Sequence, residues 1–393
     1  MKILYICSAD LSGEAGSLGS VRHILEVCEN LSQLGNRIKL IAPNFSHYPH
    51  STSIGITYVP LINIRFLRTI IYELLAPVFI AAYLVFWRPD IIYWRQAYLT
   101  LFPVLLCRVF GKIIVTEVNG LTIDEVDSEP LSVIRKKVIL KLETFNYRHS
   151  NFLICVAPKI KERILKHYHI PSNKVSVILN GVNSDRMPVI DKAKAKKKIG
   201  IDPELKVIGF VGHFFPWDGI EYLIDAAVDI VKKEKNVRFL IIGHGRWGND
   251  LPLLVKQKNL TEYFIFTGKV PWKKLYIYIN AFDIATAPYS KKINSQSGRS
   301  SLKILEYFAC KKPVVASETA VIPEVVDLAD KNLGITVPSE NSHALAEAIF
   351  NLLKDKNLRQ KIGKNGREYV VKERSWKRVA INTQKVLASL VHS

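Results

Sequence analysis

The sequence predicts an α/β protein built from two doubly wound domains that face a central crevice. Short runs rich in valine, isoleucine and phenylalanine alternate with helical segments along the whole chain, and the alternation restarts once, near residue 186. Strands that are apolar throughout are typical of a parallel sheet with helices on both faces. Because the chain has 393 residues, it is long enough for two such domains.

The first domain is expected over residues 1–186. Its strands are expected at Lys2–Cys7, Arg37–Ala42, Gly55–Pro60, Asp90–Trp94, Lys112–Val118, Asn151–Val156 and Val175–Leu179. Helices are expected at Ser20–Leu34 and Leu99–Phe110. The carboxyl ends of such strands are where open α/β sheets bind ligands.

The second domain is expected over residues 187–372. Its strands are expected at Lys206–Gly212, Arg238–Gly243, Phe264–Gly268, Asp283–Ala287, Pro313–Ala316 and Gly334–Val337. Residues 373–393 are expected to form a closing helix.

The net charge of +20 predicts an anionic partner. The basic residues are spread along the chain, with a lysine-rich run at Lys192–Lys198, and no nucleic-acid-binding motif accompanies them. We therefore expect no nucleic-acid partner, and a membrane surface with acidic lipids fits the charge better. A solvated basic face is the alternative.

The apolar stretches and the cysteines indicate a cytosolic protein that contacts the inner face of a membrane. The first residues read as a strand and not as a signal peptide. The longest uninterrupted apolar run, Leu74–Trp87, contains Pro77 and is short for a bilayer span, so a buried or interfacial helix is expected. Five scattered cysteines indicate free thiols in a reducing compartment.

The stretch from Ser295 to Ser317 predicts a loop, an amphipathic helix and a buried strand. Small residues before the helix, among them Ser300 and Ser301, are expected to leave backbone N–H groups and hydroxyls exposed at its N-terminus, which suits a phosphate. Lys303 could meet a diphosphate, and Glu306, one turn later, could bind a ribose. An ordinary helix cap with a surface Lys–Glu pair is an equally good interpretation of the spacing.

This stretch resembles the donor-site motif of family 4 retaining glycosyltransferases, which have the GT-B fold of two Rossmann-like domains. Glu306 matches the second of the family's two glutamates, and Gly298 stands where the first does. The order Ser-x-Leu-Lys before Glu-Tyr matches a variant subgroup, with Ser301 in place of its proline. The resemblance implies a donor site at Arg299, Ser300, Ser301, Leu302, Lys303 and Glu306.

Other turns of the chain resemble the same family. Pro216-Trp-Asp-Gly219 is similar to the subgroup's Pro-Trp-x-Gly motif, but His213 and Asp218 stand where the family carries an arginine and a lysine for the donor phosphates. Lys303 or Arg299 would then have to supply the positive charge. The resemblance also implies that Gly19 lies near the diphosphate and that the backbone at Val270 meets the nucleotide base.

Glu117 and Asn119 resemble the subgroup's Glu-x-Asn motif in the first domain. The resemblance implies that they, with Lys303, are catalytic, orienting the acceptor hydroxyl or the donor sugar. A helix-cap role for Asn119 is the competing interpretation. Asn180-Gly181 is similar to the family's link between domains, and the family's closing helix crosses back to the first domain.

Taken together, these motifs imply a hexosyltransferase that moves a sugar, with retention, from a nucleoside-diphosphate sugar to a glycan, lipid-linked or polysaccharide hydroxyl. No Asp-x-Asp sequence occurs, so neither a metal nor another cofactor is expected. A catalytically silent homologue that binds a nucleotide sugar or a partner remains an alternative, as does a sugar-nucleotide epimerase of the same fold. A nicotinamide-dependent dehydrogenase is disfavoured, because the glycine-rich loop before Gly19 lacks the required spacing.

Overall fold

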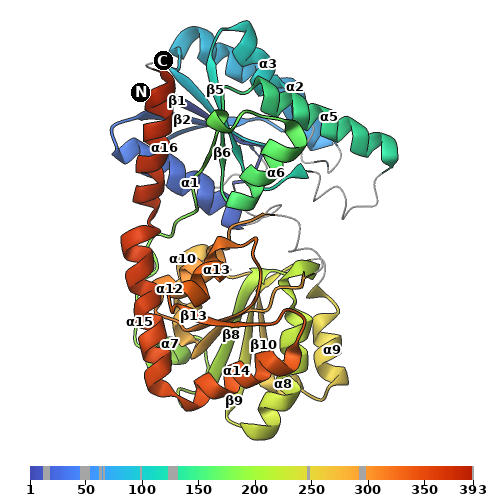
Figure 1. The fold of residues 1–393 in the computed structure, drawn as a ribbon, viewed down its shortest axis with the longest axis vertical. Coiled ribbons are helices and arrows are strands. Elements are labelled where there is room, and N and C mark those ends of the chain that lie inside the picture. The colour runs from blue at the N-terminus through green and yellow to red at the C-terminus, as the bar shows by residue number, and fades with distance from the viewer. Residues whose placement is uncertain are drawn as a thin grey trace. The chain divides into compact units, whose positions relative to one another are not determined.

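The computed structural model describes the chain except for residues 12–17, 45–53, 62–63, 65–66, 98–99, 123–131, 246–247, 292–297 and 392–393. The chain forms two compact units (Figure 1). The first comprises Met1–Asn180, Ser297–Arg299 and Trp376–Ser393, and the second comprises Gly181–Gln296 and Ser300–Ser375. The first unit therefore ends at Asn180, six residues before the boundary expected at residue 186.

The first unit is built on a seven-stranded parallel sheet of order β3-β2-β1-β4-β5-β6-β7. Its strands are β1 Lys2–Ile6, β2 Arg37–Pro43, β3 Gly55–Val59, β4 Ile91–Arg95, β5 Ile113–Val118, β6 Phe152–Cys155 and β7 Val175–Val177. Its helices are α1 Leu18–Gln33, α2 Leu67–Ala82 with the π-helical turn η1 Tyr83–Trp87, α3 Phe102–Val109, α5 Val133–His149, α6 Pro158–Tyr168 and α16 Trp376–Val391, with a short 3-10 turn, η2, at Ser172–Lys174. The strand order reverses between β1 and β4, so the switch point lies at their carboxyl ends.

The second unit is built on a six-stranded parallel sheet of order β10-β9-β8-β11-β12-β13. Its strands are β8 Lys206–His213, β9 Val237–His244, β10 Phe264–Gly268, β11 Ile284–Ala287, β12 Val314–Ser317 and β13 Gly334–Val337. Its helices are α7 Lys192–Lys198, α8 Ile220–Lys233, α9 Leu251–Gln257, α10 Trp272–Ala281, α12 Leu302–Ala309, α13 Pro323–Asp330, α14 Ser342–Lys354 and α15 Lys356–Glu373, with 3-10 turns η3 Pro216–Asp218 and η5 Thr261–Tyr263. Here the switch point lies between β8 and β11.

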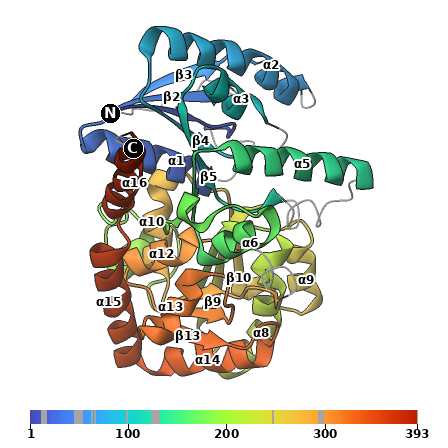
Figure 2. The same cartoon turned by 45° about the horizontal axis from the view of Figure 1, so that its top comes forward.

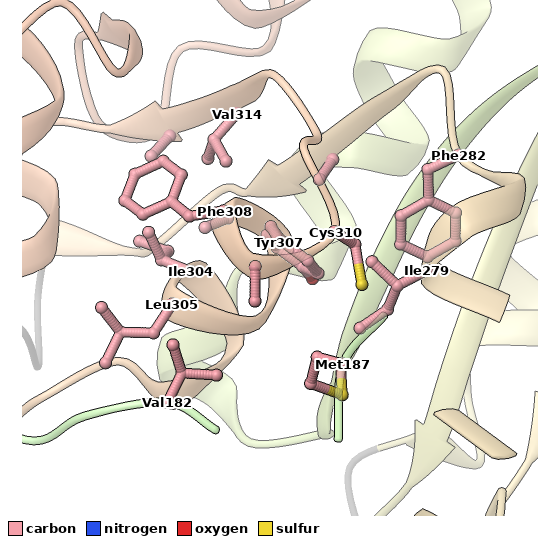
Figure 3. Close-up of a cluster of buried hydrophobic side chains, with 14 of the residues drawn as sticks. Val182, Met187, Ile279, Phe282, Ile304, Leu305, Tyr307, Phe308, Cys310 and Val314 are labelled. Atoms are coloured by element: carbon pink, nitrogen blue, oxygen red, sulfur yellow. The ribbon is translucent and has the colours of Figure 1, made fainter. Parts of the chain in front are cut away.

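The expected strands are all present, and their ends shift by at most two residues. Apolar residues fill the strands because helices cover both faces of each sheet (Figure 1). In the second unit, α10, α12 and α13 pack in one hydrophobic cluster and α8, α9 and α14 in another. Figure 3 shows α12 in the first of these clusters, where Ile304, Tyr307 and Phe308 meet Phe282 and Val314.

The closing segment of the chain is divided between the two units. Helix α15 belongs to the second unit, whereas α16 belongs to the first, where it packs against α1. The first and the last segment of the second unit are hydrogen-bonded to each other, since the Val182 N–H donates to the Arg374 carbonyl at 2.7 Å.

The structure adds detail to the basic segment and to the apolar segment. The lysine run folds as helix α7, and Lys196 is buried there because its ammonium pairs with Asp283 at 2.9 Å. The helix that holds the apolar run Leu74–Trp87 begins before it, at Leu67. Its part from Ile70 to Trp87 is long and apolar enough to cross a membrane by length and composition alone. All five cysteines are buried and free, as expected.

Candidate functional site

Lys303 lies at the switch point of the second sheet. It occupies the first turn of α12, and a Cβ added to Gly212, near the end of β8, would lie 2.9 Å from its Nζ. Its ammonium lies over the Phe210 ring, 4.3 Å from the centroid, and 5.4 Å from that of Tyr289. The sequence-predicted donor lysine therefore stands where this fold class binds ligands.

Asp218 is the anionic partner of Lys303. Its Oδ1 accepts from the Lys303 Nζ at 2.5 Å, while its Oδ2 accepts from the Phe215 N–H at 3.3 Å. The turn that carries it requires Gly219, whose φ is +64° and whose Cβ, if present, would lie 1.9 Å from the Pro288 carbonyl oxygen. The expected surface pair of Lys303 with Glu306 is therefore wrong: Glu306 is buried, and the carboxylate on Lys303 comes from the turn before α8.

The N-terminus of α12 is less open than the sequence indicated. Ser301 is buried, its N–H donates to the Glu324 Oε2 at 2.8 Å, and its hydroxyl lies 2.5 Å from the Tyr289 hydroxyl. The Ser300 hydroxyl donates to the other Glu324 oxygen at 2.7 Å. The two serines thus bind a carboxylate of the protein itself. The first-turn N–H groups that follow, beginning at Leu302, have no acceptor within the helix.

The carboxyl ends of β8, β9 and β10 bring two histidines near a further cation. The ring of His213 lies 4.8 Å from that of His244. Burial lowers the pKa of both rings, and Lys269, which directly follows β10, lowers them further. Both imidazoles are therefore neutral at pH 7, and Lys269 contributes positive charge that the sequence analysis missed. Lys269 could have been predicted from the sequence, because it directly follows the end of an expected strand. Val270, which follows it, is buried.

Gly298 and Arg299 cluster with the first unit, apart from the rest of the donor motif. A Cβ added to Gly298 would lie 2.7 Å from the Ile160 nitrogen and 2.9 Å from the Lys159 Cβ. The glutamate that the resemblance implies for this position therefore has no room.

Glu117 is the centre of a buried polar cluster in the first unit. It lies near the end of β5, where Tyr93 donates to its Oε2 at 2.7 Å and the Arg95 guanidinium to its Oε1 at 2.8 Å. The Asn119 amide donates to Oε1 at 2.6 Å, and the His23 Nε2 lies 2.9 Å from the same oxygen. In-register pairing of β4 with β5 sets Arg95 beside Glu117.

The electrostatics of this cluster keep Glu117 ionised. Burial acts to raise its pKa, but His23, Arg95 and the Asn119 amide favour the carboxylate and hold the pKa well below its usual range. Burial lowers the pKa of His23, against the pull of Glu117. A carboxylate of such low basicity, with four donors around it, is suited to positioning Arg95 and Asn119 and not to accepting a proton from a substrate.

Sequence reasoning found Glu117 and Asn119 but missed His23, Tyr93 and Arg95. Arg95 could have been found as a charged residue that closes an apolar strand. Gly19, the remaining predicted residue of this unit, is the second residue of α1 and is half-buried. Within the described parts of the chain, no group of three or more His, Cys, Asp or Glu side chains could hold a metal ion.

Comparisons with known proteins match both units. The family described as Glycosyltransferase Family 4 matches residues 18–186, and the family described as Glycosyl transferases group 1 matches residues 191–369. An uncharacterized glycosyltransferase of Methanocaldococcus jannaschii is 28% identical over 266 residues, 67% of this chain and 64% of that protein. The alpha-D-kanosaminyltransferase of Streptomyces kanamyceticus is 21% identical over 272 residues, 67% of each chain. The chain thus spans just under two thirds of the length of the archaeal relatives that it matches.

Solved structures share the fold over nearly the whole chain. The sucrose-phosphate synthase of Thermosynechococcus elongatus superposes with a TM-score of 0.81, at 18% identity, over 100% of this chain and 99% of that one. Anabaena HepE, solved in complex with UDP-glucose, superposes with a TM-score of 0.75, at 16% identity, over 99% of this chain and 100% of that one.

Proposed function

The chain carries the two domains of a GT-B glycosyltransferase of the family 4 and group 1 type, and from this premise we propose that it moves a sugar from a nucleoside-diphosphate sugar to an acceptor hydroxyl. Retention of the anomeric configuration is part of the proposal. The observation that carries it is the position of Lys303, a cation held at the ligand-binding switch point of the second sheet and at a helix N-terminus.

The chemistry assigned to this site is stabilisation of the leaving diphosphate. Cleavage of the sugar–phosphate bond leaves its electron pair on the diphosphate oxygen, and negative charge grows there. The Lys303 ammonium, the first-turn N–H groups of α12 and the Lys269 ammonium are preorganised donors for that charge. Asp218 holds Lys303 in place and would share its ammonium with the incoming diphosphate.

On the acceptor side, Asn119 and Arg95 are the polar groups we assign to orienting a hydroxyl, with Glu117 fixing both. We propose a glycan, a lipid-linked sugar or a polysaccharide as the acceptor, at the cytoplasmic face of a membrane. The HepE structures with UDP and UDP-glucose make UDP the first nucleotide to test.

A second candidate function follows from the charges around Lys303. The lysine is already paired with Asp218, and the α12 serines already bind Glu324. Groups that are already paired within the protein are less available to stabilise a leaving diphosphate. The second candidate is therefore a homologue that binds a nucleotide sugar or a partner without turnover.

The test is a thermal-shift screen of the purified chain with UDP, GDP, ADP and TDP, each with and without EDTA. A ligand that binds only the native state raises the unfolding midpoint. We expect a shift with one nucleotide that EDTA leaves unchanged and that Glu306→Ala reduces. The control is Lys364→Ala, since Lys364 is 71% exposed on α15 and pairs only loosely with Glu368. No shift with any nucleotide would reject donor binding, whereas binding without hydrolysis or transfer would favour the silent homologue.

A further inference from the structure

The helical segment from Leu67 to Trp87 carries two apolar stripes. The inner stripe is buried in the cluster that contains β4 and α3, and its members are Tyr72, Ala76, Ile80 and Leu84. The outer stripe consists of large apolar side chains that are between 44% and 87% exposed: Leu67, Ile70, Leu74, Val78, Val85 and Phe86. Spacings of three, four, four and seven residues put Leu67, Ile70, Leu74, Val78 and Val85 on one side of the helix, and Phe86 directly follows Val85.

Helix α3 extends the exposed apolar surface. It packs against α2, and the two helices lie beside each other at the periphery of the first unit (Figure 2). Leu105 and Val109 on α3 and Phe110 directly after it are exposed as well. We call the outer stripe together with these three residues the α2–α3 surface. Nine large apolar side chains are thus exposed on this surface, and soluble proteins rarely leave a large apolar patch in water unless it binds something.

Cations border the α2–α3 surface. Arg68 and Arg88 stand at the two ends of the helical segment, and Arg108 is exposed on α3. The residues from 67 to 112 contain only two acidic side chains, Glu73 and Asp90. Glu73 accepts from the Thr100 hydroxyl at 2.6 Å, and Asp90 accepts from the Lys2 N–H at 2.7 Å. The border is therefore net positive, in keeping with the charge of +20 for the whole chain.

We propose that the α2–α3 surface docks this protein onto a lipid bilayer rich in anionic headgroups. The outer stripe lies at the boundary between headgroups and acyl chains, and the bordering arginines meet lipid phosphates. Apolar side chains flanked by arginines are the composition that binds such a surface. A protein partner would not require an apolar stripe with cations at both ends.

Docking on the bilayer fits the structure better than spanning it. The stretch Ile70–Trp87 has a mean hydropathy of 2.0, and 22% of it is buried. That buried part is the inner stripe, and the Tyr72 hydroxyl donates to the Cys7 carbonyl, at the end of β1, at 2.7 Å. A transmembrane position would strip this stripe from the sheet that it covers, whereas an interfacial position leaves it in place.

We assign to this surface the role of bringing the acceptor site to a membrane-borne sugar chain, and that role rests on the proposed function. The binding of the surface to a bilayer does not depend on it. The direct experiment is co-sedimentation of the purified full chain with vesicles of phosphatidylcholine alone or mixed equally with phosphatidylglycerol. We expect binding to the mixed vesicles that weakens as salt is added, and little binding to phosphatidylcholine.

The test variant is Leu74→Gln with Val78→Gln, two exposed positions whose change leaves the core intact. We expect it to bind the mixed vesicles at least about tenfold more weakly. The control is Leu253→Gln with Val371→Gln, two apolar residues of the second unit that are also more than half exposed. This variant should bind like the wild type. The unfolding midpoint without ligand reports whether each variant is folded.

Three outcomes would overturn the proposal. They are no binding of the wild type at low salt, equal binding by the test variant, and a wild-type dimer in sedimentation that the test variant turns into a monomer. The last would identify the surface as a subunit interface. Binding to vesicles without a nucleotide-induced rise of the unfolding midpoint would reject the transferase but support the docking surface. A nucleotide-induced rise without vesicle binding would reject only the docking surface.

Discussion

At the scale of single residues, the donor site that we propose for the second unit rests on two side chains of α12. Lys303 presents its charge at the switch point, whereas Glu306 is buried one turn further along α12. A group that meets charge developing in the transition state affects turnover, whereas one that holds the bound nucleotide affects binding.

Substitution of these two residues should therefore separate the kinetic constants. We expect Lys303→Ala to lower kcat by about tenfold to a hundredfold, since a hydrogen bond to a charged group contributes about 1.5–3 kcal/mol. We expect Glu306→Ala mainly to raise the KM for the donor. Steady-state kinetics with the nucleotide sugar found in the thermal-shift screen would measure both, and unchanged constants in both variants would remove α12 from the site.

Asp218 should compete with the donor for Lys303. We expect Asp218→Asn to tighten nucleoside-diphosphate binding about threefold to tenfold, because the ammonium loses its carboxylate partner while the amide oxygen can still accept from the Phe215 N–H. Titration calorimetry would measure the change. Weaker binding would instead mean that Asp218 is needed to aim the lysine.

Glu117 should make the stability of the protein depend on pH. Its pKa in the folded protein lies below the ordinary value of 4.5, so its contribution is present above that value and is lost as the pH falls towards the folded pKa. We expect Glu117→Gln to destabilise the protein by about 3 kcal/mol at neutral pH, because Arg95 is left buried without its counter-charge. Urea unfolding at several pH values should show this gap narrowing below about pH 4.5. A gap that stays constant on acidification would contradict the assignment.

At the scale of elements, the N-terminus of α12 is held by a chain of contacts that ends at α15. Glu324, on α13, accepts from Ser300 and Ser301 and is fully buried, and Arg374, the residue after α15, pairs with it. Helix α12, which carries the proposed donor site, is thus fixed by the segment in which the chain leaves the second unit.

Removal of the arginine should loosen this support. We expect Arg374→Ala to destabilise the second unit by about 3–5 kcal/mol, because Glu324 stays buried without its cation. Chemical unfolding would measure the loss, with Lys364→Ala as an exposed control that should change stability by less than about 1 kcal/mol. An equal effect of the two substitutions would show that the buried pair does not support the fold.

At the scale of the whole molecule, α16 completes the first unit from the far end of the sequence. Trp376 packs edge-on against His23, with the ring centroids 5.1 Å apart, and Asn36 on the α1 side donates to Gln384 at 3.4 Å. The helix therefore supports the same histidine that contacts Glu117.

Truncation after Ser375 should act on one unit only. We expect the unfolding midpoint of the first unit to fall, because the buried contacts of Val379 and Leu387 on α16 are lost and the face of α1 that α16 covers is exposed. The nucleotide-dependent shift of the second unit should persist. Calorimetry with and without the nucleotide would resolve the two effects, and loss of both together would show that the units do not fold independently.

The sequence by itself determined the architecture and marked out much of the candidate site, whose role stays a prediction. Strands buried on both faces must be apolar, so Lys2–Ile6 or Val314–Ser317 could be recognised without knowing their neighbours. Lys303 and Glu117 could be found because each lies beside a helix start or a strand end, which local patterns reveal.

Tertiary structure alone decided what these residues touch. Lys303 pairs with Asp218, which lies 85 positions away in the sequence. Glu117 contacts His23 and Arg95, which lie 94 and 22 positions away. The same is true of the exposed stripe of α2, since the residue types alone mark the exposed Leu74 and the buried Ile80 as similarly apolar. Only the packing of one side of the helix on the sheet leaves the other side exposed. Partners and exposure arise from the whole fold, and local sequence does not encode them.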